Sequence, residues 1–225
     1  IGDYAGTFLD SIAQGGLATI LCLVLAYPLA FSIARSSERV QQTMVLIVML
    51  PMWMNFLLRT LAWMTLLEDK GLINQFLGLL GLGPVHMINT DGAVVLGMVY
   101  NFLPFMIYPI YNTLQKMDRS LIEAAQDLGA NPFQVFMKTI FPLSMPGVMS
   151  GIVMVFMPTV STFAIAELLT MNNIKLFGTT VQENINNGMW NYGAALSLIM
   201  LLLIGVTILF TNEEDNASNE GGGVI

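Results

Sequence analysis

The sequence predicts an all-α membrane protein, a bundle of about five transmembrane helices with a short helix–turn–helix between two of them. Of its 225 residues, 55% are hydrophobic and only 10% are charged, and the mean hydropathy is +0.70. An ordinary soluble domain carries about 25% charged residues, so the surface of a chain this poor in charge has to face lipid. Apolar stretches of membrane length recur along the chain, and one unusually polar segment, residues 120–147, lies between two of them.

The apolar stretches define the predicted spans. A hydrocarbon core about 30 Å thick is crossed by roughly 20 apolar residues in helical form. Prolines interrupt most of these stretches, which membrane helices tolerate where neighbouring helices satisfy the freed carbonyls. We therefore expect bent helices. The predicted spans are residues 12–33, 44–67, 93–114, 148–169 and 193–210.

Basic residues predict the orientation of the bundle, because cytoplasmic loops carry an excess of Lys and Arg. Arg35 and Arg39 follow the first span, and Lys116, Arg119 and Lys138 follow the third. We therefore expect these two loops on the cytoplasmic side. An odd number of spans then places the first residues outside without a signal, so we expect a further helix upstream and a parent of about six spans.

The chain reads as one transmembrane domain over residues 1–211. Residues 212–225 are acidic, glycine-rich and without periodicity, so they are predicted to form a disordered tail.

The polar segment is predicted to fold into two short helices. Ser120 and Glu123 have the spacing of a capping box at a helix start. Gly129 suits the left-handed residue that ends this helix. Asn131 can cap the next helix, whose first residue is a proline and which we expect to stop near Pro142. Such a helix–turn–helix suits insertion into a partner's groove; the alternative is an ordered loop that only joins two spans, with Glu123 serving as a cap.

The same segment, "EAAQDLGANPFQVFMKTIFPLSMPG", resembles the EAA loop of binding-protein-dependent ABC importer permeases. The matching positions are Glu123, Ala124, Ala125, Gly129 and Pro142. Thr139 and Phe141 depart from the Ile and Leu usual in that family. The resemblance implies that residues 120–142 form coupling helices that dock into a cytoplasmic ABC ATPase.

The resemblance extends over residues of roughly 10–210 and is strongest to spermidine/putrescine permeases. It implies a plasma-membrane subunit that forms a translocation path for a polyamine substrate. It further implies a second permease subunit and an extracytoplasmic substrate-binding protein as partners, with membrane lipid around the helices. Two alternatives stay open: an ABC permease for another small solute, or a secondary transporter or channel that works without an ATPase.

The sequence lacks the residues that several other functions require. There is no G-x-x-x-x-G-K-[ST] phosphate cradle, so we expect no ATP hydrolysis and no cofactor in this chain, with ATP used by a partner subunit. Cys22 and His86 are the sole cysteine and histidine, so no metal site is expected. No nucleophile–base set can be placed on one face, which argues against an intramembrane enzyme. Nothing resembles a basic nucleic-acid surface.

A cationic substrate calls for carboxylates and aromatic faces along its path. The candidates are Glu167, Trp53, Trp63, Tyr100 and Tyr108. The alternative for Glu167 is a solvated residue at the headgroup boundary.

Other polar or small residues within the spans are expected to be structural. Arg59 is expected to pair with an acidic residue or to reach the membrane surface. Asn55 and Asn101 are expected to bind helix to helix, and Gly147 and Gly151 to allow close helix packing.

Overall fold

The computed structural model describes residues 2–171 and 173–220, and every regular element in that part of the chain is helical. Two elements are not α-helices: η1 is a 3₁₀ turn and η2 is a π-helical turn. The elements are α1 (Gly2–Ala34), α2 (Glu38–Met49), η1 (Leu50–Trp53), α3 (Phe56–Leu67), α4 (Leu72–Leu79), α5 (Asp91–Gln115), α6 (Arg119–Asp127), α7 (Pro132–Val135), η2 (Phe136–Ile140), α8 (Phe141–Ser161), α9 (Ala164–Thr170), α10 (Phe177–Asn186) and α11 (Trp190–Glu220).

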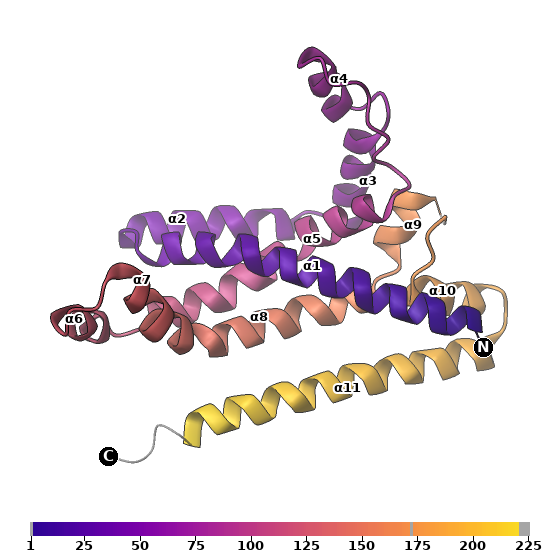
Figure 1. Ribbon diagram of the computed structural model, residues 1–225. Helices are drawn as coiled ribbons and strands as arrows, with labels where there is room; N and C mark the ends of the chain where they lie inside the picture. The colour runs from indigo at the N-terminus through magenta and orange to yellow at the C-terminus, as the bar shows by residue number, and fades with distance from the viewer. Residues whose placement is uncertain (1, 172, 221–225) are drawn as a thin grey trace.

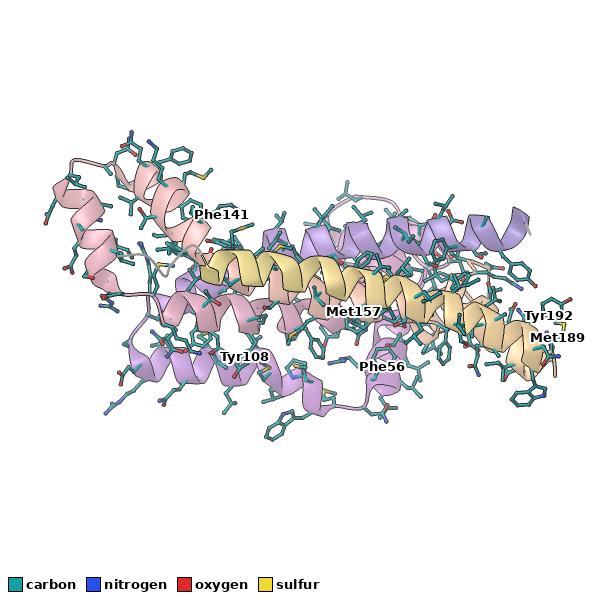
Figure 2. The ribbon with its side chains drawn as sticks, turned by 90° about the horizontal axis from the view of Figure 1, so that it is seen from below. Phe56, Tyr108, Phe141, Met157, Met189 and Tyr192 are labelled. Atoms are coloured by element: carbon teal, nitrogen blue, oxygen red, sulfur yellow. The ribbon has the colours of Figure 1, made fainter. Side chains whose placement is uncertain are left out.

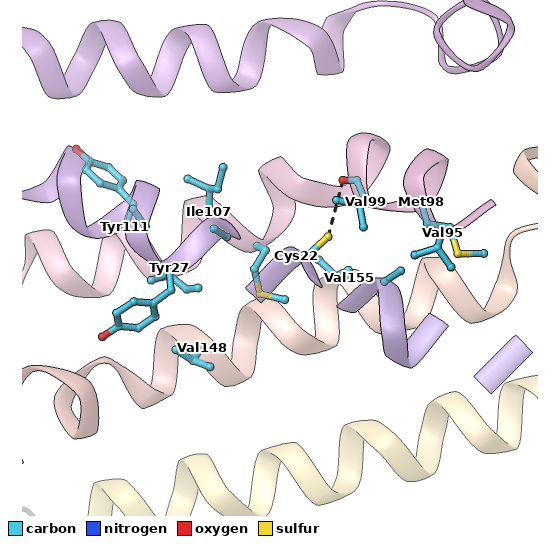
Figure 3. Packing of buried hydrophobic residues seen from close by; sticks show 14 of the residues in the cluster. Cys22, Tyr27, Val95, Met98, Val99, Ile107, Tyr111, Val148 and Val155 are labelled. Atoms are coloured by element: carbon cyan, nitrogen blue, oxygen red, sulfur yellow. Dashed lines mark hydrogen bonds between the residues drawn. The ribbon is translucent and has the colours of Figure 1, made fainter. Parts of the chain in front are cut away.

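The core is a layer of three long helices, α1, α5 and α8, packed against one another (Figure 1). Cys22 on α1 is fully buried, and its thiol donates to the carbonyl of Val99 on α5 at 3.8 Å (Figure 3). Helices α6 and α7 lie at one end of this layer, and α9 and α10 lie at the other. Helix α11 runs from the α10 end back toward the α6–α7 end.

Small residues allow α8 to approach α5 closely. A Cβ placed on Gly147 would lie 2.7 Å from the carbonyl oxygen of Pro109, and one on Gly151 would lie 2.7 Å from the sulfur of Met106. Real Cβ atoms do not approach other atoms so closely, so Gly147, which faces a backbone carbonyl, needs glycine, whereas a Cβ at Gly151 would require the flexible Met106 side chain to move. The predicted role of these two glycines in helix packing is confirmed.

The second predicted span, residues 44–67, is not one straight helix. It breaks at η1, and the helices on the two sides of the break are inclined by 92°. Pro51 lies in the 3₁₀ turn, where the missing N–H and the fixed φ of proline disrupt an α-helical ladder. Asn55 then caps α3 by accepting from the backbone N–H groups of Leu57 and Leu58. The prediction that Asn55 binds another helix was therefore wrong, because its own backbone uses the side-chain oxygen.

The fourth predicted span, residues 148–169, is displaced in the structure. A continuous helix of membrane length runs over Pro132–Ser161, and α9 follows as a separate short helix. The helix does not stop near Pro142 as predicted. The π-helical turn η2 precedes that proline, with the N–H of Phe141 bonded to the carbonyl of Phe136. Such a turn shifts the hydrogen-bond pattern by one residue, which lets the helix pass the proline.

By length and composition, three helices can cross a membrane, or four if the bent pair counts as one span, among the residues that the structure describes. The fifth predicted span falls within α11 (Trp190–Glu220), where Trp190–Val206 is apolar. Helix α11 continues to Glu220, so residues 212–220 of the predicted disordered tail are helical. Glu, Ala and Asn tolerate a helix that an apolar segment has already nucleated. Residues 221–225 lie outside the described residues.

Candidate functional sites: the α6–α7 hairpin and the aromatic pairs

The start of α6 is fixed by Asp118 rather than by the predicted capping box. Asp118 adopts an extended conformation, and its carboxylate accepts from the backbone N–H of Ser120 at 2.9 Å. The backbone N–H and the hydroxyl of Ser120 lower the pKa of Asp118 below its ordinary value of 3.8. The Ser120–Glu123 box was wrong, because the cap is two residues earlier, at Asp118, and Glu123 then lies beyond the position from which a side chain reaches back to the cap.

Helix α6 ends in a Schellman motif, in which the N–H groups of two residues just after the helix donate to carbonyls of its last turn. The N–H of Gly129 donates to the carbonyl of Gln126 at 2.8 Å, and that of Ala130 donates to Ala125 at 3.1 Å. Gly129 has a φ of +81°, which glycine adopts without steric cost. The predicted left-handed glycine is confirmed.

The next helix begins at Asn131, as predicted. Asn131 accepts from the N–H of Gln134 at 2.8 Å, and the Gln134 side chain accepts from the N–H of Asn131 at 3.0 Å. This is a reciprocal capping box, and Pro132 occupies the first helical position. The partner role of Gln134 was missed, although its spacing from Asn131 was a usable signal.

Together α6, α7 and the turn between them form a hairpin that we call the α6–α7 hairpin, residues 119–135. Its inner face, with Ile122 and Ala125, packs on the core of the bundle. Its outer face is unusually apolar, with Leu128 89% exposed and Phe133 71% exposed. Caps therefore define where the helices of the hairpin begin, while large apolar side chains on its outer face remain exposed.

The predicted coupling residues are distributed around this hairpin. Glu123 and Ala124 are exposed, and Gly129 lies at the turn. Glu123 also lines a cavity of about 740 Å³ between the hairpin and the α1–α2 turn, together with Arg35 and Arg119. Pro142 is exposed but lies past the π-helical turn, in the first turn of α8.

Two of the aromatic candidates are in ring contact, and the other two line one cavity. Trp63 on α3 and Tyr100 on α5 are in edge-to-face contact, with ring centroids 5.1 Å apart. Trp53 and Tyr108 line a cavity of about 590 Å³ between α2 and α5, and Figure 2 shows Tyr108 on the side of α5 that faces α2. Glu167 makes no ion pair with any of the described residues. It is exposed on α9.

Arg59 lies beside the first pair, and sequence reasoning misjudged it. Its side chain is only 8% exposed, and it makes no ion pair within the described chain. Instead, Nη1 donates to the carbonyl of Pro51 at 2.7 Å, and the guanidinium lies 5.7 Å from the ring centroid of Tyr100. The predicted acidic partner was wrong, because a carbonyl freed at the helix break supplies the contact.

Of the remaining polar residues, Asn101 is buried and its Oδ1 has no hydrogen-bond partner among the described residues, whereas His86 is exposed. Asn101 donates to the carbonyl of Gly97 on its own helix at 2.8 Å, so the predicted helix-to-helix bond is absent from the described contacts. The Nδ1 atom of His86 lies 2.9 Å from Oδ1 of Asp69, and both side chains are exposed. No group of three or more His, Cys, Asp or Glu side chains that could hold a metal occurs within residues 2–171 and 173–220.

Comparison with known proteins decides the family. Residues 23–212 match the family described as "Binding-protein-dependent transport system inner membrane component". The chain belongs to this family. It is therefore an inner-membrane transport component, and its apolar helices make it a multi-pass membrane protein.

Among its relatives is the spermidine/putrescine transport system permease protein PotB of Haemophilus influenzae, 37% identical over 208 residues, which are 91% of this chain and 73% of the relative. PotB of Escherichia coli K12 is 35% identical over 209 residues, covering 92% of this chain and 76% of the relative. The inner membrane ABC transporter permease protein YdcU of Escherichia coli K12 is 30% identical, covering 90% of this chain and 69% of the relative.

A solved structure shares the fold. A chain of a bacterial alginate ABC transporter, in complex with its alginate pentasaccharide-bound periplasmic protein, superposes with a TM-score of 0.76 at 18% identity, covering 91% of this chain and 75% of the other. The break at η1 and the α6–α7 hairpin therefore belong to a chain with the fold of an ABC transporter subunit.

Proposed function

We propose that this chain is the permease subunit of an ATP-driven importer for spermidine and putrescine. The observation that carries the proposal is the similarity to PotB proteins, at 35–37% identity across more than nine-tenths of this chain. Two permease subunits enclose the translocation path, and an extracytoplasmic binding protein delivers the substrate. ATP is hydrolysed on a separate subunit.

The α6–α7 hairpin supports the coupling half of the proposal. Leu128 and Phe133 are large apolar side chains that project from a rigidly capped hairpin. Exposed apolar patches with polar rims mark protein–protein contacts. In this proposal the hairpin faces the cytoplasm and inserts into a groove of the ATPase, so that closure of the ATPases moves α8 through the continuous helix Pro132–Ser161.

The aromatic residues support the proposed polyamine substrate. Ring faces attract ammonium groups with roughly 0.5–2 kcal/mol each, depending on how far water is excluded. Trp53 on η1, Trp63 on α3, and Tyr100 and Tyr108 on α5 present such faces. The proposal assigns these residues to the wall of the path.

The test is uptake by cells that express the chain with its three partner subunits. Labelled spermidine and putrescine are compared with labelled sulfate and phosphate, and an ATPase subunit with a disabled phosphate-binding loop is the control. We expect ATP-dependent polyamine uptake. Uptake of an anion without polyamine uptake would reject the substrate, and uptake that persists with the disabled ATPase would instead favour a secondary transporter.

A further inference from the structure

Arg59 bridges the break in the second span. The two arms of this span are inclined by 92°, and Arg59 is the fourth residue of the second arm, α3, at the end of its first turn. Its Nη1 reaches back eight residues to the carbonyl of Pro51, 2.7 Å away. The same carbonyl accepts from the backbone N–H of Met54 at 3.2 Å. The side chain thus completes the hydrogen bonding of a carbonyl that the 3₁₀ turn has removed from the α-helical ladder.

The other contact of this guanidinium is with α5. It lies 5.7 Å from the ring centroid of Tyr100, within the range of a cation–π interaction. Tyr100 in turn meets the edge of Trp63, which is one helical turn beyond Arg59 on α3. One side chain therefore connects η1, α3 and the aromatic pair on α3 and α5.

The charge of Arg59 is not explained by the stability of α3. A cation near a helix N-terminus opposes the helix dipole. The side chain is only 8% exposed, its Nε has no hydrogen-bond partner within the described chain, and no carboxylate there pairs with it. A buried charge without a counter-charge is costly and is kept in membrane proteins for a function. The carbonyl and the ring face are the two groups that hold it.

We propose that Arg59 is a positioning residue that fixes the angle of the broken span and orients the Trp63–Tyr100 pair for a cationic substrate. The proposal rests on the proposed function, because it assumes that this pair contacts the substrate. Arg59 acts through Tyr100 and Pro51. Its own charge does not attract the substrate, since like charges repel.

The experiment uses the assembled transporter with Arg59→Met, Arg59→Lys and, as a control, Lys70→Gln. Met keeps the apolar stem without the charge, and Lys keeps the charge without the planar fork that reaches the carbonyl and the ring together. Lys70 is an exposed cation just beyond α3, so its removal changes net charge on the same side without touching the break. Spermidine uptake is measured against concentration to separate KM from the maximal rate.

A second readout does not depend on transport. Replacing Trp53 and Trp190 by Phe leaves Trp63 as the sole tryptophan of this chain, so that differences between variants of the same complex report on Trp63. Its emission and its quenching by acrylamide report the packing of the pair. We expect Arg59→Met to raise KM for spermidine about tenfold and to increase quenching of Trp63. Arg59→Lys should recover part of both effects, and Lys70→Gln should change neither.

The outcomes are distinguishable. Unchanged Trp63 quenching in Arg59→Met would overturn the positioning role whatever the substrate is. A lowered KM in that variant would also overturn it, because the charge would then only be repelling the substrate. If the unaltered transporter takes up no polyamine, the proposed function fails, and the fluorescence result still decides whether Arg59 holds the pair.

Discussion

At the scale of single residues, the start of α6 depends on one carboxylate. The first N–H groups of any helix lack intrahelical partners, and a side chain that satisfies one of them defines where the helix begins. Asp118, Ser120 and Glu123 all had suitable chemistry, and local backbone geometry selected Asp118. Asn131 had no such competitor at the start of α7, which is why its role could be predicted from sequence.

Replacing Asp118 by Ala is expected to loosen the first turn of α6. The amide of Ser120 loses its acceptor, and amide hydrogen exchange at Ser120 and Leu121 should be roughly fivefold faster. Asp118→Asn is the matched control, because Asn caps about as well as Asp. Equal exchange in Ala and Asn variants would contradict the assigned cap.

The pH dependence of this cap follows from the lowered pKa of Asp118. A carboxyl whose folded-state pKa is depressed stabilises the fold fully above its ordinary pKa, here 3.8, and this contribution is lost as pH falls through the lower folded value. Protection of α6 should therefore stay constant from neutral pH down to about 4 and fall below it. The Asp118→Asn variant should show no such loss.

At the scale of elements, two irregular turns give the helices their functional shapes. The 3₁₀ turn η1 bends the second span, and the π-helical turn η2 joins α7 to α8 without a break. Aromatic contacts hold η2 in place, since Phe136 meets Tyr27 and Phe31 of α1 edge to face, with centroids 5.8 Å apart in each case. The turn that follows the α6–α7 hairpin is therefore in contact with α1 and continuous with α8.

The apolar face of the α6–α7 hairpin should determine ATPase binding. Leu128→Ser and Phe133→Ser each remove an exposed side chain without altering a cap, and burying such a side chain contributes about 1.5–3 kcal/mol. We expect at least about a tenfold loss in the ATPase recovered with the purified permease complex. Leu79→Ser, at an 85% exposed position on α4, is the control and should change nothing. Undiminished recovery for both hairpin variants would exclude this surface as the docking site.

The contact between α5 and α8 should not accept a larger residue at Gly147. A methyl group there would meet the Pro109 carbonyl at 2.7 Å, and overpacking of this kind costs about 1–3 kcal/mol. Gly147→Ala should lower the temperature at which the detergent-solubilised protein aggregates by several degrees. Gly205→Ala on α11 meets nothing within 4 Å and should leave that temperature unchanged or raise it slightly. Equal behaviour of the two variants would show that the helices can separate at no cost.

At the scale of the whole molecule, five of the eight basic residues lie at one end. Arg35, Arg39, Lys116, Arg119 and Lys138 belong to the segments at the α6–α7 end of the bundle. From the positive-inside rule we expect this end in the cytoplasm and α9 and α10 toward the outside. Under the proposed function, the ATPase and the binding protein would then meet opposite ends of the same three-helix layer.

Labelling with a membrane-impermeant maleimide tests the orientation. The single native thiol, Cys22, is fully buried and gives a silent background. We expect His86→Cys to be labelled in intact cells, and Ser37→Cys only after the membrane is permeabilised. Both positions are exposed in the structure, so access depends on the side of the membrane. Labelling of Ser37→Cys in intact cells would reverse the assignment.

The sequence by itself determined those features that depend on residues a few positions apart. Apolar stretches of membrane length placed the first and third spans, Gly129 and Asn131 defined the turn of the hairpin, and the segment around Glu123 pointed to the family. Each of these signals is local, because helix length, a left-handed glycine and a helix cap involve only neighbouring residues.

Only the tertiary structure decided where distant groups meet. Proline in an apolar stretch indicates a bend but not its angle, which at Pro51 depends on how α3 packs against α5 and α9. Arg59 could have paired with an acid, and the fold instead offered it the Pro51 carbonyl and the ring of Tyr100. The contact of Trp63 with Tyr100 could not be predicted from the sequence either. It depends on how α3 packs against α5, and no local sequence rule determines which helices lie side by side.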